Sequence, residues 1–184
     1  MANNLIGTDR RRGSRWRIIG WGIAAFVLIL PLIANAPWTA ADYIFDAIMI
    51  GGVGALLELA VRMSRNPAYR AAVGAALAAA FLIIWVHAAV GLIGDGDDPV
   101  NLLFAGVLAL ALLGSIVVRF RPAGMARVMT LAAAAHLVAG GLGTVTDPRG
   151  GVLSASFAVL WLLSAMLFAK AARDHRSANA PVSG

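Results

Sequence analysis

The chain has 184 residues, of which 60% are hydrophobic and only 13% are charged. Soluble domains average about 25% charged residues, so long apolar runs between short charged clusters indicate a membrane protein instead. The chain has no cysteine, which excludes disulfides, thiolate metal sites and a cysteine nucleophile.

Six apolar runs are long enough to cross a bilayer, which takes about 20 residues in a helix. They are continuous rather than alternating, which predicts helices rather than strands. The sequence therefore predicts an all-α, polytopic transmembrane bundle of six helices, at residues 16–36, 40–62, 71–94, 99–118, 125–143 and 152–171. A basic tail at 1–14 precedes the transmembrane domain at 15–172, and a disordered tail follows at 173–184.

Of the 15 basic residues, all but Arg149 fall on one side of this six-helix arrangement. The positive-inside rule makes that side cytoplasmic and places both termini there. Abundant arginine and alanine are typical of a GC-rich bacterial genome, so we expect the bacterial inner membrane. The net charge of +6 is then a topology signal that also attracts anionic lipid headgroups, and nucleic acid is not an expected partner.

Residues 16–36 also fit a secretory signal peptide, because Ala34-Asn35-Ala36 resembles a cleavage site that follows arginines and an apolar run. The run is longer than the usual signal core of about 7–15 residues. Cleavage would also have to occur directly before Pro37. We therefore predict an uncleaved span.

The pattern H-x3-G-x2-G-x3-D-P occurs twice, beginning at His87 and at His136. It favours a duplication in which helices three and four form one hairpin and helices five and six form a related one. Chance similarity in an alanine- and glycine-rich chain is the alternative. The second glycine of each copy is predicted to be a left-handed helix C-cap, and the aspartate an N-cap followed by proline. These residues are Gly94, Gly143, Asp98 and Asp147. The stretch Thr39-Ala-Ala-Asp42 is likewise predicted to form a capping box that opens the second helix.

The caps leave His87 and His136 unexplained. Each is expected about 10 Å below a helix end, and ionisable residues at such a depth are candidates for function. Asp46 in the second span is a third candidate, since a lone carboxylate in the membrane must be protonated or paired. Together they form a candidate intramembrane polar site for a proton or cation. The alternatives are a neutral imidazole bonded to a carbonyl of a neighbouring helix, and interfacial hydration of Asp46.

Other polar residues have simpler explanations. Glu58 and Arg62 are spaced as an i,i+4 ion pair. A candidate outer acidic loop contains Asp95, Asp97 and Asp98. The intramembrane serines can bond back to their own helices. The sequence contains no P-loop, G-x-G-x-x-G, H-E-x-x-H or G-x-S-x-G pattern, so we predict no catalytic residue, no metal and no enzyme activity.

The stretch Trp85-Val-His87-Ala-Ala-Val-Gly-Leu-Ile-Gly94, followed by Asp98-Pro99-Val-Asn101, resembles a family of small bacterial polytopic membrane proteins without an assigned activity. The family pattern is close to W-V-N-x-A-V-G-I-I-G followed by N-P-x-N. The similarity continues through Arg119-Phe-Arg-Pro-Ala-Gly-Met-Ala-Arg127. The resemblance implies a polytopic membrane fold. It also implies that a histidine is not essential at His87, where the family favours asparagine.

Three functions fit the sequence. The first is a non-enzymatic scaffold or accessory protein, without a cofactor, acting as a homo-oligomer or in a membrane complex. The second is a small proton or cation transporter or channel that uses Asp46, His87 and His136. The third is a redox protein that holds haem b between His87 and His136, or binds a quinone nearby.

Overall fold

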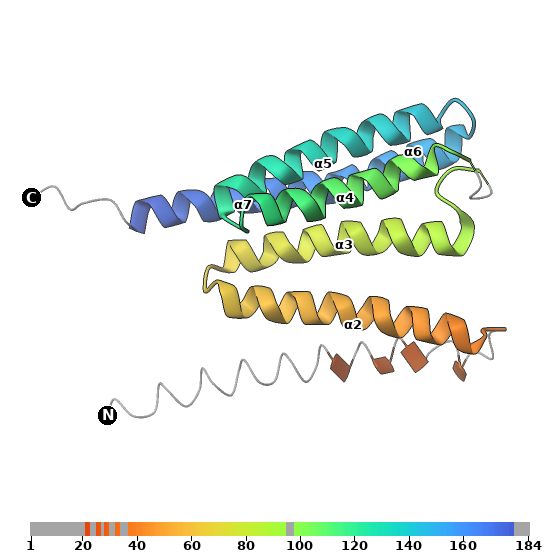
Figure 1. Cartoon of the computed structure of the whole chain (residues 1–184), viewed down its shortest axis with the longest axis horizontal. Helices are drawn as coiled ribbons and strands as arrows, with labels where there is room; N and C mark the ends of the chain where they lie inside the picture. Colours follow the sequence, from red (N-terminus) through yellow and green to blue (C-terminus); the bar gives the residue numbers. More distant parts are fainter. Residues whose placement is uncertain are drawn as a thin grey trace, which may run out of the picture. The chain divides into compact units, whose positions relative to one another are not determined.

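The computed structural model describes residues 21–22, 25–26, 28–29, 32–33, 37–94 and 98–178. Within these ranges the secondary structure is helical and no strand occurs. The helices are α2 (Ala40–Met63), α3 (Pro67–Val90), α4 (Asn101–Val117), α5 (Pro122–Gly143), α6 (Pro148–Ser156) and α7 (Ala158–Ala178) (Figure 1). The chain divides into two compact units, Met1–Leu56 and Leu57–Gly184, and the boundary lies inside α2.

The all-α prediction is confirmed. Four helical segments are long and apolar enough to cross a membrane, namely α2, α3, α5 and the combined segment Pro148–Ala178. Helix α4 is also apolar but has only 17 residues. The described helices therefore occupy five of the six predicted positions, and at four of these they are long and apolar enough to cross a membrane. The span predicted at 16–36 is described only at residues 21–22, 25–26, 28–29 and 32–33, which are helical, and its other residues lie outside the described part.

Local sequence signals explain where the helices begin. At the start of α2, the backbone N–H and the hydroxyl of Thr39 donate to Asp42 at 2.7 and 2.8 Å, which confirms the capping box. Helix α3 begins at Pro67, earlier than the predicted residue 71, because Asn66 accepts hydrogen bonds from the backbone N–H groups of the first turn.

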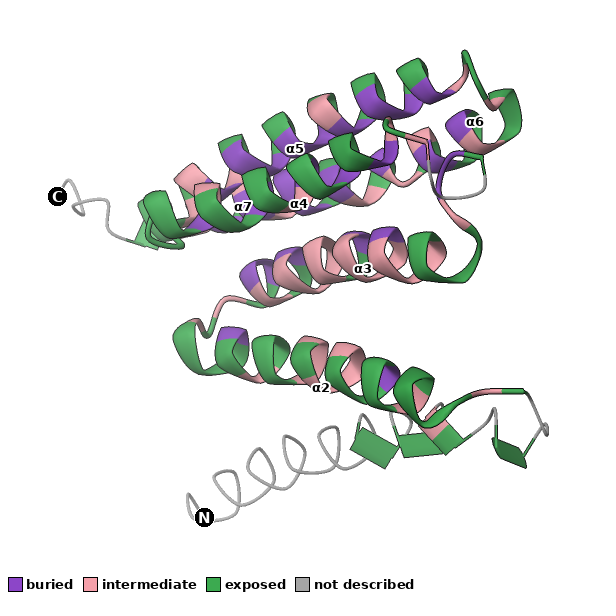
Figure 2. Cartoon of the chain, turned by 45° about the vertical axis from the view of Figure 1, so that its right-hand side comes forward, coloured by how far each residue is buried: buried purple, intermediate pink, exposed green. Residues whose placement is uncertain are grey.

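In the unit Leu57–Gly184, helix α7 packs against both α3 and α5, and α4 packs against α5 (Figure 1). Small residues line these contacts and let the backbones approach closely. The hydroxyl of Ser164 on α7 donates to the carbonyl of Ala72 on α3 at 2.8 Å. On the other side, Gly114 of α4 lies directly against Val128 of α5. The buried residues of these helices face one another, while much of each outer surface is exposed and apolar (Figure 2).

One end of this unit gathers the basic connections. The side chain of Asn66, between α2 and α3, donates to Asp174 of α7 at 3.2 Å. The hydroxyl of Tyr69 on α3 donates to the carbonyl of Phe120, between α4 and α5, at 3.1 Å. These bonds place three charged segments together, which carry Arg62, Arg65, Arg70, Arg119, Arg121, Lys170, Arg173 and Arg176.

Helix α7 ends later than the span that was predicted at 152–171. It continues to Ala178, so the prediction of disorder is wrong for residues 173–178. An i,i+4 pair between Lys170 and Asp174, with 3.3 Å between nitrogen and oxygen, accompanies this extra turn, and Asn66 also bonds Asp174. Residues 179–184 lie outside the described part of the chain.

Candidate functional site

His136 lies in α5 and is completely buried, at 0% exposure. Its Nε2 is 2.8 Å from the carbonyl oxygen of Ser154, and its Nδ1 is 3.3 Å from the indole nitrogen of Trp161. Because an indole N–H can only donate, Nδ1 must accept. Nε2 therefore carries the proton and donates to Ser154. The Phe104 ring makes a T-shaped contact with the imidazole, with 5.1 Å between ring centroids.

The bond from His136 to Ser154 lies where one predicted span is divided. Helix α6 ends at Ser156 and α7 begins at Ala158. The Ser154 carbonyl accepts from the backbone N–H of Phe157 at 3.0 Å, which is an i+3 bond, and also accepts from the histidine ring. A side chain that inserts into the i+4 ladder breaks a helix. His136 thus accounts for the interruption between α6 and α7.

The connection between α3 and α4 is fastened to the same region. The hydroxyl of Ser154 donates to the carbonyl of Leu92 at 3.1 Å. The amide of Asn101 makes two bonds to the backbone of Ile93, accepting from its N–H and donating to its carbonyl, each at 3.0 Å. Leu92 and Ile93 are buried. This part of the connection is therefore a fixed element of the bundle.

Asp147 adds a further link at this end. It is the N-cap of α6, as predicted, and accepts from the N–H of Gly150 at 2.9 Å. Its other oxygen accepts from the N–H of Gly94 at 3.2 Å. These two hydrogen bonds, the one from Gly150 first, hold the pKa of Asp147 below its usual range. Asp98 does not cap α4 as predicted, because the helix begins at Asn101 and not at residue 99. Asp98 instead accepts from the N–H of Val100, the residue before the helix.

The predicted glycine caps are partly wrong. Helix α3 ends at Val90 and is capped by Gly91, with a φ of 79°, while Gly94 is left-handed but lies in the connection. Gly143 is the last residue of α5 and is followed by Thr144 in a right-handed conformation. A Cβ at Gly143 would collide with Ile93, so this glycine is explained by close packing and not by a cap.

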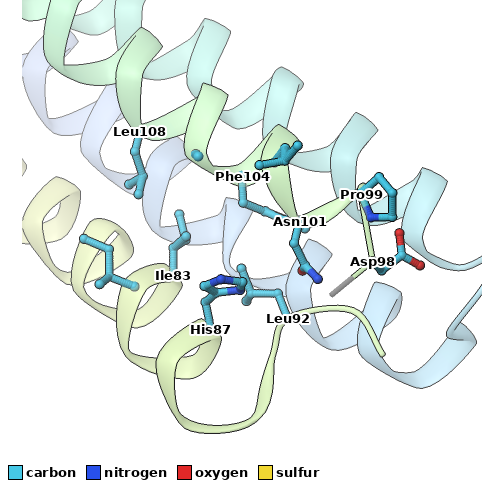
Figure 3. A pocket seen from close by; sticks show the side chains of 11 residues that line it. Ile83, His87, Leu92, Asp98, Pro99, Asn101, Phe104 and Leu108 are labelled. Carbon is cyan, nitrogen blue, oxygen red and sulfur yellow. The ribbon is translucent and has the colours of Figure 1, made fainter. Parts of the chain in front are cut away.

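The two histidines are not at equal depth, which corrects a second prediction. His87 lies in the last turn of α3, because the helix ends three residues later, and it is exposed. His136 is buried well inside α5. His87 lines a cavity beside α3 and α4, where Figure 3 shows it near Leu92 and Ile83. The two copies of the sequence pattern therefore have different local structures.

A haem held by His87 and His136 would require each ring to present a nitrogen to the iron. Both ring nitrogens of His136 are already engaged, by Ser154 and Trp161. Binding iron would break one of these bonds. The imidazole instead bonds a carbonyl of a neighbouring helix, which is the structural alternative that the sequence left open.

Asp46 lies in α2, in the unit Met1–Leu56, and is 1% exposed. Neither of its carboxyl oxygens has a hydrogen-bond partner among the described residues. Both histidines belong to the other unit. The convergence of Asp46 with His87 and His136 therefore stays a prediction, whereas Asp46 is buried and has no hydrogen-bond partner within the described part of the chain.

The remaining candidate residues are peripheral. Arg62 and Glu58 form the predicted pair at 3.4 Å, but the Arg62 side chain is 72% exposed, so the pair adds little stability. Asp95 and Asp97 lie outside the described residues. Within the described ranges, no three histidine, cysteine or acidic side chains are grouped closely enough to hold a metal ion.

Comparison with known proteins gives no match to a family model, to a curated protein or to a solved structure. The resemblance of the stretch around His87 to a bacterial membrane family therefore stays a prediction.

Three residues of the buried network were not identified from the sequence as members of it. Ser154 was expected to bond its own helix, but its hydroxyl bonds Leu92 in the α3–α4 connection. Trp161 and Asn101 carried no assigned role. The signal that could have identified them is a polar residue within an apolar stretch, because a buried polar group needs a hydrogen-bond partner. The sequence does not show which residue that partner is.

Proposed function

We propose that the chain is a non-enzymatic integral protein of the bacterial inner membrane that serves as a scaffold or accessory subunit. We further propose six spans with both termini in the cytoplasm. The clustering of basic residues at one end of the α3–α7 bundle supports this orientation, because the positive-inside rule assigns such an end to the cytoplasm. The same end is suited to bind anionic lipid headgroups.

The observation that carries the scaffold proposal is the use made of the polar groups inside the bundle. Four polar residues are buried, and the side chain of each donates a hydrogen bond to a backbone carbonyl of another segment. These residues are His136, Asn101, Ser154 and Ser164. A polar group that is buried and satisfied fixes the packing of neighbouring helices. This arrangement is suited to holding a defined shape in the membrane.

A second candidate, a proton or cation pathway, is favoured by one specific observation. Asp46 is buried without a hydrogen-bond partner among the described residues. A charged carboxylate buried alone costs several kcal/mol, on the order of the penalty for any unpaired ion in a protein interior. A proton or a cation bound at Asp46 would remove that cost, and intramembrane carboxylates with this chemistry serve ion pathways.

One experiment separates the two candidates. The full chain is reconstituted in vesicles that contain a pH-sensitive dye, and proton or potassium flux is measured after an imposed gradient. The variants are Asp46→Asn and, as a control, Glu58→Gln, which removes a half-buried carboxylate of the same helix that pairs with Arg62. The scaffold proposal expects the rate of protein-free vesicles in every case. Flux above that rate, lost in Asp46→Asn but kept in Glu58→Gln, would replace the scaffold proposal with the pathway.

The redox alternative has a separate test. The absorption spectrum of the purified chain is expected to lack a Soret band, because His136 makes two structural hydrogen bonds. A Soret band that disappears in His136→Ala would overturn the scaffold proposal in favour of a haem protein.

A further inference from the structure

A cavity of about 520 Å³ lies between α3 and α4 in the unit Leu57–Gly184. Ile83 and Ile84 of α3 form one wall, and Phe104 and Leu108 of α4 form the other. The volume falls in the range of small-molecule sites, about 300–1,000 Å³. Figure 3 shows Ile83 and Leu108 farther from the α3–α4 connection, and His87, Asn101 and Asp98 closer to it.

The cavity exists because α3 and α4 pack mainly on other helices. Helix α3 packs on α7 and α4 packs on α5, while α3 and α4 meet each other only slightly. The walls are nevertheless firmly held, since Ile83 and Phe104 are almost fully buried. The bonds between Asn101 and Ile93 fix the part of the connection that follows Leu92, which also lines the cavity. The cavity is thus a preformed space between fixed elements.

Its polarity changes along its length. The apolar walls run beside α4 from Phe104 to Leu108, and the polar residues His87 and Asp98 stand where α3 ends and before α4 begins. In a membrane-crossing helix, that is the passage from hydrocarbon toward the interface. A ligand that fits both parts is an amphiphile, with an apolar chain between the helices and a polar head at His87 and Asp98.

The charge at the mouth selects the head. Asp98 uses one oxygen to accept from Val100 and keeps further acceptor capacity, and His87 lines the same end of the cavity. A carboxylate repels an anionic head and favours a group that donates hydrogen bonds. Geometry and charge point to a binding site for an uncharged single-chain lipid with a hydroxyl-bearing head, of the monoacylglycerol class. This inference is independent of the scaffold proposal.

The test uses the full chain in phosphatidylcholine nanodiscs that contain a monoacylglycerol with a photoactivatable chain. After illumination, peptide mass spectrometry locates the label. We expect labelling to concentrate on the two cavity walls, at residues 83–92 and 98–108. Excess unlabelled monooleoylglycerol should compete, whereas oleate should not, because its carboxylate faces Asp98.

Matched variants sharpen the result. Ala105 lines the cavity and is exposed, while Ala109 is exposed on the same helix but does not line it. Ala105→Phe is expected to lower labelling about tenfold, and Ala109→Phe to leave it unchanged. Asp98→Asn keeps the acceptor for Val100 and removes the charge, so oleate should then compete.

Three results would overturn the proposal. Labelling spread evenly over the exposed apolar faces of α5 and α7, and unaffected by Ala105→Phe, would show ordinary boundary lipid only. Equal competition by oleate and monooleoylglycerol in the unmodified chain would contradict the selection by Asp98. Loss of the label on residues 83–92 in Ala109→Phe would show that the variants act through misfolding, which would also contradict a local site.

Discussion

His136 donates from Nε2 to the backbone carbonyl of Ser154 at 2.8 Å, beside the residue at which α6 gives way to α7. One ring thus joins three helices, because Trp161 of α7 donates to its other nitrogen. A histidine buried in an apolar bundle suggests function when the sequence is considered alone. In the structure its two hydrogen bonds join α5 to both α6 and α7, on either side of the interruption between these two helices.

Replacing His136 should destabilise the bundle strongly. His136→Ala leaves a cavity and removes the partner of the buried Trp161 N–H, so we expect a loss of about 2–4 kcal/mol in the free energy of unfolding. Denaturation in mixed micelles measures this loss. The control is His87→Ala, which removes an exposed histidine and should change stability by less than about 0.5 kcal/mol. Equal effects of the two substitutions would refute a structural role specific to His136.

Gly140 and Gly141 make a matched pair in α5. A Cβ at Gly140 would lie 2.9 Å from the backbone of Ala155, whereas a Cβ at Gly141 would meet nothing within 4 Å. Because backbone atoms cannot move aside cheaply, Gly140→Ala should cost about 1–3 kcal/mol. Gly141→Ala should be neutral or stabilise the helix by up to about 1 kcal/mol. The same micelle denaturation compares them, and similar values would mean that α5 and α6 do not approach as closely as described.

Arg119 is a site where a substitution should stabilise the protein. Its φ is 52°, in the left-handed region that favours glycine. It lies in the turn that follows α4, which is closed by a 3.0 Å bond from the N–H of Phe120 to the carbonyl of Ser115. Arg119→Gly should therefore raise the free energy of unfolding by about 1 kcal/mol. Arg127→Gly, in the interior of α5, should lower it by about the same amount. A loss of stability in Arg119→Gly would show that the side chain outweighs the backbone strain.

The stability of the end that contains Asp147 should depend on acid pH. Hydrogen bonds from Gly150 and Gly94 lower the pKa of Asp147 in the folded state. A lowered folded pKa stabilises the fold above the unfolded value of about 3.9, and this contribution is lost as the pH falls through the folded value. The melting temperature of the unmodified chain should therefore fall in acid more steeply than that of Asp147→Asn, which retains an acceptor. Parallel curves for the two proteins would contradict the pKa assignment.

The sequence predicted the helices well because span length and hydropathy depend on local composition. It predicted the caps at Thr39 and Asp147 for the same reason, since a cap involves residues three positions apart. It missed the early start of α3 at Pro67, where the charges of Arg65 and Arg70 obscured the cap at Asn66.

The candidate site was harder to predict because its partners are distant in the sequence. The bond between Ser154 and Leu92 and the bond between Ser164 and Ala72 each join different helices or connections. The repeated pattern suggested equivalent environments for His87 and His136. Gly91, which has a positive φ, ends α3 early, so that His87 lies exposed in the last turn, whereas His136 is buried well inside α5.

The central claim is that His136 is a structural hub and not part of a pathway or a cofactor site. Nitrogen NMR of histidine-labelled protein in nanodiscs, with His136→Gln used to assign the signal, tests it most directly. The hydrogen bonds predict that Nε2 carries a proton and that Nδ1 is a bare acceptor, and that Trp161→Phe shifts only the Nδ1 signal. A His136 ring protonated at Nδ1, or one in exchange with water, would contradict the account.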